Sequence, residues 1–127
     1  MTSARILMPL TVTPAMVVTG TTIAEPDTSR GEVAWLVGTA YTVGQRRTNA
    51  GSIWEAVAAS TGVTPGTDGT KWLRFGPTNR TAAFDEYTTT RSVGTTSITY
   101  VLRPGFINGL RLDGLEGVQL VATLKAT

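Results

Sequence analysis

The chain has 127 residues, of which 41% are hydrophobic and 16% are charged, and it contains neither Cys nor His. This length suffices for one globular domain, and the missing residue types exclude disulfide scaffolds, zinc fingers and catalysis by a thiolate or an imidazole. The formal net charge is only +2, and the Arg residues are interleaved with acids, so we expect no nucleic-acid partner. We also expect no metal and no cofactor.

The amino-acid usage favours strands over helices. We count 24 Thr residues beside 14 Gly and 6 Pro. Thr is β-branched and suits half-buried strands, whereas Gly and Pro mark frequent turns. The sequence therefore predicts one all-β domain over residues 1–127, a small β-sandwich or partly open barrel with an extended N-terminal arm.

The chain opens with a short apolar segment that Pro9 keeps out of a central strand position. Residues 1–13 are expected to form an edge strand or an arm laid on a neighbouring subunit. Residues 13–23 are predicted to be one strand, and residues 24–31 a loop rich in turn-forming residues. No secretory signal is visible, and the longest apolar run, 118–124, is too short to cross a membrane, so we expect a protein made and kept in the cytoplasm, with no membrane partner.

An aromatic stretch occupies residues 33–85. Short apolar runs at 38–44, 52–58 and 71–75 are predicted strands, and residues 61–70 form a turn-rich loop. A helix over 53–60 remains the alternative, because Glu55 and several alanines favour it.

The C-terminal third has a different pattern. Three predicted strands over residues 95–124, at 96–102, 106–112 and 117–124, are joined by turns at 103–105 and 113–116. Ile98, Tyr100 and Leu102 share one face at a period of two residues. Regular turn spacing of this kind is typical of a sandwich or barrel.

No enzyme signature emerges from the polar residues. A carboxylate pair would have to combine Glu55 with Asp85 or Glu86, but we expect Asp85 to accept turn hydrogen bonds and Glu86 to be solvated. Arg46 and Arg47 are expected on a loop, either solvated or facing another subunit.

The aromatic residues are the candidates for a ligand site. A flat surface could stack on a sugar ring, or the same side chains could form the core; they are Trp35, Tyr41, Trp54 and Trp72. Sugar recognition would require at least two coplanar, solvent-facing indoles.

Two family resemblances lie in this region. Residues 41–44, 52–56, Pro65 and Trp72 resemble the short chitin-binding-type carbohydrate module. Directly after it, the Gly-Pro-Thr-Asn-Arg run at 76–80 resembles a segment that recurs in tailed-bacteriophage virion proteins. In those proteins Trp and Met usually stand where this chain has Thr81 and Ala83, followed as here by Phe84-Asp85.

The second resemblance also marks a structural corner, consisting of Trp72, Gly76, Pro77, Thr78, Asn79, Arg80 and Asp85. Pro77 fixes its own backbone and disfavours helix at Gly76. Thr78 and Asn79 can close local hydrogen bonds. Arg80 is expected to pair with Asp85 or to stack on an indole. The corner is expected either to staple two sheets or to clamp a ligand.

The phage resemblance implies a non-enzymatic structural component of a virion tail, in its tip, baseplate or fibre-attachment region. Its partners would be other tail proteins and further copies of itself in a cyclic ring. The carbohydrate resemblance implies the alternative, a module that binds host-surface glycans during adsorption.

Overall fold

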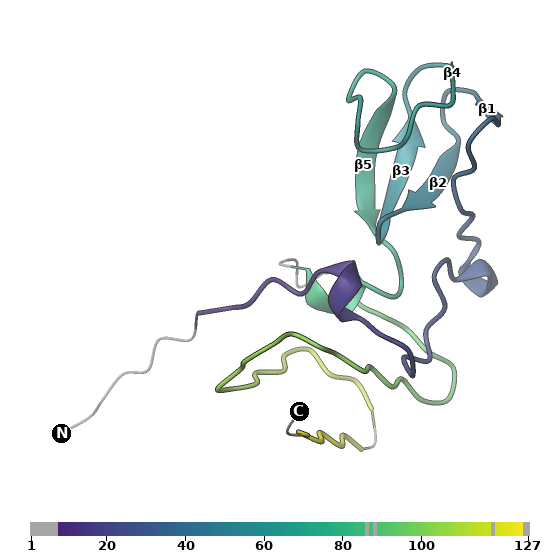
Figure 1. The fold of residues 1–127 in the computed structure, drawn as a ribbon. Helices are drawn as coiled ribbons and strands as arrows, with labels where there is room; N and C mark the ends of the chain where they lie inside the picture. Colours follow the sequence, from purple (N-terminus) through teal and green to yellow (C-terminus); the bar gives the residue numbers. More distant parts are fainter. Residues whose placement is uncertain (1–7, 86, 88, 118, 126–127) are drawn as a thin grey trace.

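The computed structural model describes residues 8–85, 87, 89–117 and 119–125, and its regular structure is all-β (Figure 1). Five strands form two antiparallel sheets, and no closed barrel is present. The sheets gather at one end of the molecule, whereas the C-terminal third lies at the other end (Figure 1). Within the described residues, the regular helices are three-residue 3-10 turns, and none has the length or apolarity to cross a membrane.

The three-stranded sheet begins with a tight hairpin. β2 (Arg46–Asn49) pairs with β3 (Ser52–Ala56), with Asn49 opposite Ser52. The two residues between them, Ala50 and Gly51, both have positive φ, at 49° and 72°. Positive φ at both central positions is the geometry that matches the twist of a two-residue hairpin.

β5 (Trp72–Pro77) completes this sheet against β3. The register shifts between Ile53 and Trp54, which is a β-bulge. β1 (Ala40–Tyr41) and β4 (Ser60–Thr61) form the second, two-stranded sheet. The predicted strands at 38–44, 52–58 and 71–75 are thus confirmed in part, with shifted ends, and the helical alternative for 53–60 is wrong.

Both sheets contribute to one small core. Tyr41 of β1, Ala56 of β3 and Trp72 of β5 are 2%, 0% and 1% exposed. The Tyr41 and Trp72 rings meet edge to face, with centroids 5.3 Å apart. Complete burial of one Trp contributes at most roughly 4–6 kcal/mol from the apolar area removed from water. Trp72 is therefore the centre of this core.

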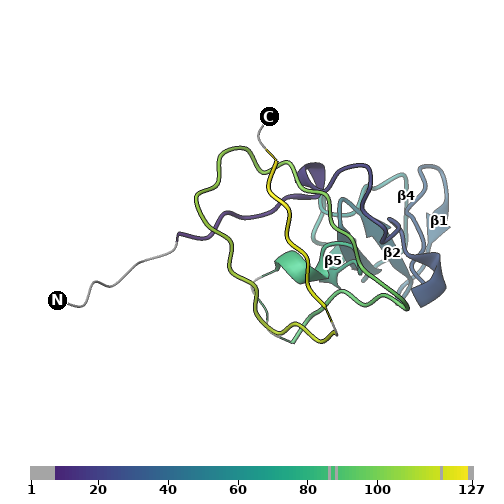
Figure 2. The same ribbon diagram turned by 90° about the horizontal axis from the view of Figure 1, so that it is seen from below.

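Two predictions of strands are wrong. Residues 13–23 contain a 3-10 turn, Pro14–Met16, and a single bridge from Val17 to Leu102 instead of one strand. The described residues of 95–124 contain no strand, and this part of the chain forms a wide open loop (Figure 2). An alternating pattern gives a strand its faces, but a strand also needs a continuous main-chain ladder with a partner. Only three main-chain hydrogen bonds join residues 16–22 to residues 99–103, and the described residues of 104–125 have none.

The N-terminal arm is extended in its described part. Residues 8–13 have no regular structure, and the chain leads away from the body in both views (Figures 1 and 2). Met8 is 88% exposed. Residues 1–7 of the predicted arm lie outside the described residues.

Candidate functional site

The Gly-Pro-Thr-Asn-Arg corner is the most densely hydrogen-bonded part of the molecule. It follows β5 directly, and Thr78 and Asn79 are 0% and 6% exposed. The Thr78 N–H donates to the Gly51 carbonyl at 3.1 Å, so the corner is fastened to the β2–β3 hairpin turn. The Thr78 hydroxyl donates to the Glu25 carboxylate at 2.6 Å. Thr78 and Asn79 are thus the buried centre of the corner.

Both the main-chain N–H and the side-chain amide of Asn79 have hydrogen-bond partners. Its N–H donates to Glu32 Oε1 at 2.6 Å, and its Nδ2 donates to Asp27 Oδ2 at 2.7 Å and to the Val93 carbonyl at 2.9 Å. Its Oδ1 accepts from the Val93 N–H at 2.8 Å. A buried amide with this many partners positions the segments around it, because leaving any partner unpaired costs free energy.

Arg80 does not make the predicted contacts. Its guanidinium donates to the Ile23 carbonyl at 2.8 Å and to the Val17 carbonyl at 3.2 Å, rather than to Asp85 or onto an indole. The planar fork of Arg reaches several acceptors at once, and irregular backbone offers carbonyls that no strand has paired. Asp85 instead accepts from the Thr90 hydroxyl and the Tyr87 N–H, as a turn acceptor does.

Three acidic residues of the loop before the sheets face this corner. Glu32 is buried, at 8% exposure, and its second oxygen accepts from the Asp27 N–H at 2.7 Å. Partial burial raises the pKa of Glu25, whose carboxyl also feels the charge of Glu32, although the Thr78 hydrogen bond and Arg80 act in the opposite direction. Hydrogen bonds from Ser29 and Asn79 lower the pKa of Asp27.

The C-terminal side of the corner is tied down by Ser92 and Tyr100. The Ser92 hydroxyl donates to the Asn79 carbonyl, and the Tyr100 hydroxyl donates to the Arg80 carbonyl at 3.0 Å. The Tyr100 ring meets Phe84 edge to face, and burial raises the pKa of its phenol. The corner thus joins one sheet to two irregular segments, whereas a staple between two sheets was expected.

The four candidate aromatic residues do not form a stacking surface. Tyr41 and Trp72 are interior, while Trp35 and Trp54 are half-buried and pack against them. The Trp72 Nε1 donates to the Val63 carbonyl at 2.9 Å, which fixes the ring in place. The sugar-stacking alternative built on all four rings is therefore wrong, and the core interpretation is correct.

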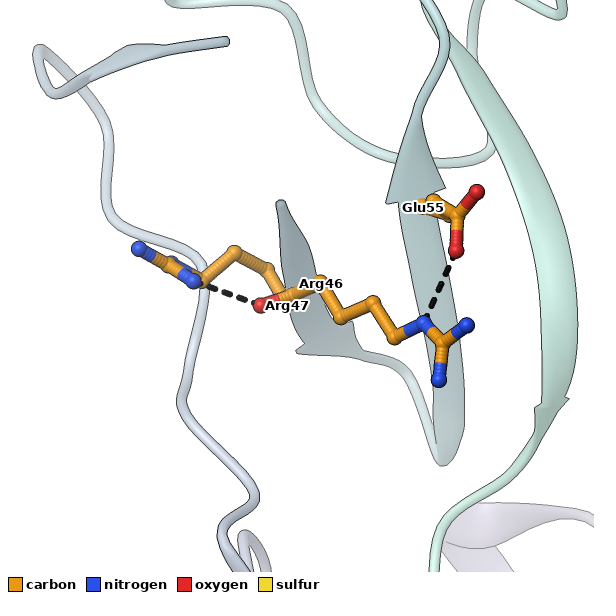
Figure 3. A network of polar contacts seen from close by, with 3 residues as sticks. All are labelled: Arg46, Arg47 and Glu55. Atoms are coloured by element: carbon orange, nitrogen blue, oxygen red, sulfur yellow. Dashed lines mark hydrogen bonds and ion pairs between the residues drawn. The ribbon is translucent and has the colours of Figure 1, made fainter. Parts of the chain in front are cut away.

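The Arg46-Arg47 pair lies on strand β2 and not on a loop. Figure 3 shows the two side chains leaving the strand in opposite directions. Arg46 Nε lies 2.8 Å from Glu55 Oε2, and its guanidinium lies 3.5 Å from the centroid of the Phe75 ring. Arg47 points the other way, with its guanidinium 5.1 Å from the centroid of Tyr41. Glu55 is thus paired with Arg46 across the two strands.

A shallow open hollow of about 310 Å³ lies beside the corner. The arm residues Thr11 and Val12 line one part of it, and Ala50, Arg74 and Phe84 line others. Among the described residues, no group of three or more carboxylates is arranged to hold a metal ion. The start of the described chain therefore forms one wall of this hollow.

The segment after the corner leaves its large apolar side chains in water. Phe106 is 93% exposed, Val121 73% and Leu124 77%. Among the described residues of 104–125, no main-chain hydrogen bond is present. Large apolar side chains of this segment are therefore not part of a core in the single chain.

Sequence reasoning missed most partners of the corner. Glu25 and Asp27 were assigned to the loop over 24–31, and Glu32 and Ser92 were not singled out. Gly51 was also missed, although a Cβ there would lie 2.7 Å from Pro14 Cγ and 2.8 Å from Thr81 Cγ2. The Ala-Gly pair between two alternating runs was the available signal for that turn.

Comparison of the chain with protein-family models, with curated proteins and with solved structures finds no match.

Proposed function

We propose that this chain is a non-enzymatic structural subunit of a bacteriophage tail, located in the tip, baseplate or fibre-attachment region, and that it acts by assembly. The observation that carries the proposal is the exposed apolar segment 104–125, whose described main-chain groups have no hydrogen-bond partner. Free strand-forming segments pair with other chains, because this supplies the missing main-chain hydrogen bonds and buries apolar surface.

The assignment to a phage tail rests on the resemblance at residues 76–80. The residues of that run are the ones that fasten the corner: Thr78 and Asn79 are buried and Arg80 holds the main chain of residues 17 and 23. A motif with such a role would be retained wherever the same corner is needed to hold a subunit in shape.

The arm gives the subunit a second means of contact. Its described residues 8–11 are exposed and extend from the body. An extended arm can lie along a neighbouring subunit and add hydrogen bonds across the interface. We expect the neighbours to be other tail proteins and further copies of this chain in a ring.

Labelling of purified virus particles tests the proposal. An antibody raised against this chain should decorate the tail in negative-stain electron micrographs. Particles assembled with the chain lacking residues 2–12 should be depleted of it, although the truncated chain keeps the circular dichroism spectrum of the intact one. Particles that never carry the chain would overturn the assignment to the tail, and normal incorporation of the truncated chain would overturn the role of the arm.

A further inference from the structure

The segment 106–121 carries the sequence pattern of a β-hairpin that the single chain does not form. Asp113 and Gly114 make a two-residue turn of the Asp-Gly kind, the strongest short-range hairpin signal. Folding about this turn places Leu112 opposite Leu115 and Arg111 opposite Glu116. The same register brings together further matched pairs: Asn108 with Gln119, Ile107 with Leu120, and Phe106 with Val121.

This register sorts the side chains onto two different faces, because successive residues of a strand alternate. One face carries only uncharged residues, namely Phe106, Asn108, Leu110, Leu112, Leu115, Gln119 and Val121. The opposite charges of Arg111 and Glu116 meet on the other face, where cross-strand ion pairs are favourable. A shift of the pairing register by one residue would place charged residues on the uncharged face and would separate Arg111 from Glu116.

The structure explains why the hairpin is not formed in the single chain. Gly114 has a positive φ of 64°, but Asp113 does not share it, although such a turn needs it at both positions. The chain on either side of the turn stays open (Figure 2). Phe106, Leu110 and Leu115 of the uncharged face are 93%, 56% and 60% exposed. An isolated two-stranded hairpin is at best marginally stable in water, so this one needs a surface that covers its apolar face.

We propose that residues 106–121 fold into this hairpin when its uncharged face packs against the same face of a second copy of the chain. The inference rests on the proposed function and names the partner of the unpaired segment. An identical face is a suitable cover because it meets its copy without burying a charge, and a buried unpaired charge would be costly. The net charge of +2 also opposes self-association only weakly.

The packing of two identical faces is an isologous contact with two-fold symmetry. It covers Phe106, Leu110, Leu112, Leu115 and Val121 of both copies and leaves the other face, with the Arg111–Glu116 pair, Ile107 and Leu120, in water. In the single chain, Arg111 instead lies 2.9 Å from Asp113 and Arg91 lies 2.7 Å from Glu116, at well-exposed sites. Such surface ion pairs contribute little, so exchanging them for the cross-strand pair opposes the change only slightly.

The register can be tested with disulfides because the chain has no Cys of its own. In the double variant Ile107→Cys and Leu120→Cys, the two thiols lie on directly opposed positions of a non-hydrogen-bonded pair, whose closer side chains suit a disulfide. In the control, Ile107→Cys and Gln119→Cys, the thiols lie on opposite faces. At a high concentration of the full chain in a glutathione buffer, the first variant should form several times more intrachain disulfide. Equal yields would overturn the hairpin register.

Sedimentation equilibrium of the full chain tests the second copy. The unaltered chain should dimerise with rising concentration. Leu110→Asp, on the uncharged face, should weaken the dimer at least about tenfold, whereas Ile107→Asp, on the other face, should leave it unchanged. A chain that stays monomeric up to its solubility limit, or equal weakening by both variants, would overturn the inference.

These outcomes are independent of the particle experiment. A monomeric chain that nevertheless labels the phage tail would leave the tail assignment standing and remove the self-association. A dimeric chain that is absent from particles would support the self-association and overturn the tail assignment. Both aspartate variants should keep the thermal unfolding midpoint of the unaltered chain, because residues 106–121 lie outside the core and the corner.

Discussion

Two parts of this chain have similarly alternating sequences, but only one of them forms strands. Residues 40–80 form two sheets around Trp72 and end in a corner whose polar groups are paired. Residues 104–125 have the same alternation, yet their described part has no strand and no main-chain hydrogen bond. Alternation therefore determines which residues share a face of a strand, whereas the strand itself forms only where its main chain pairs with another segment.

The largest expected contrast is between two aromatic residues. Trp72→Ala removes the centre of the core and should cost about 3–5 kcal/mol of unfolding free energy, a large share of the stability of a small domain. Phe106→Ala should change it by less than about 0.5 kcal/mol, because that ring is already in water. Urea denaturation followed by circular dichroism measures both variants. Similar losses would contradict the division of the chain into two parts.

A smaller contrast separates two asparagines. Asn79→Ala removes the side-chain hydrogen bonds to Asp27 and to both main-chain groups of Val93, and we expect a loss of about 2–3 kcal/mol. Asn108→Ala removes an amide from the open segment and should have no measurable effect on a dilute chain. Urea denaturation measures both variants. An unchanged unfolding free energy in Asn79→Ala would mean that the corner does not hold the irregular segments.

Two glycines with positive φ give the next contrast. Gly51→Ala puts a Cβ within 2.8 Å of Thr81 Cγ2 and 2.7 Å of Pro14 Cγ. The left-handed backbone alone costs about 1–2 kcal/mol for a residue with a side chain. Gly114→Ala meets no atom within 4 Å, and its unpaired backbone can relax. The melting temperature should therefore fall for the first variant only, and equal shifts would contradict this reasoning.

The smallest expected effects are those of pH at the corner. Because burial raises the pKa of Glu25, the folded chain holds that proton more tightly than the unfolded chain, and stability falls as pH rises between the unfolded and the folded pKa. Hydrogen bonds from Ser29 and Asn79 lower the pKa of Asp27, so its contribution is present above its unfolded pKa and is lost as pH falls through the folded one.

Two amide variants separate these opposing contributions. Glu25→Gln should flatten the fall in stability with rising pH, and Asp27→Asn should flatten the loss in acid. Both variants should change the melting temperature less than Asn79→Ala does. Melting temperatures measured from pH 3 to pH 8 test the signs, and a steeper fall in the Glu25→Gln variant would contradict the burial of that carboxyl.

Sequence reasoning recovered the features that depend on local chemistry. The strands near 52–56 and 72–75 follow from side-chain alternation, although β5 continues through Gly76 and Pro77, where a turn was expected. The aromatic core also followed, because one small domain can hardly leave several indoles exposed.

The remaining features depend on partners far away in the sequence. The acceptors of Arg80 are main-chain carbonyls of residues 17 and 23, which no side-chain pattern reveals. Glu32 is buried because it accepts the Asn79 N–H from 47 positions along the chain. The strands predicted at 13–23 and over 95–124 failed for the same reason, since main-chain pairing is a property of two segments and alternation describes only one.

The most direct test is hydrogen exchange of the intact chain, measured in dilute solution and in the assembled state. It shows whether the C-terminal segment gains main-chain hydrogen bonds only on assembly. In dilute solution we expect slow exchange in 53–56 and 78–80 and free-peptide rates in 104–117. On assembly, the amides of 104–117 should become protected. Protection of 104–117 equal to that of 53–56 in the dilute single chain would contradict this account.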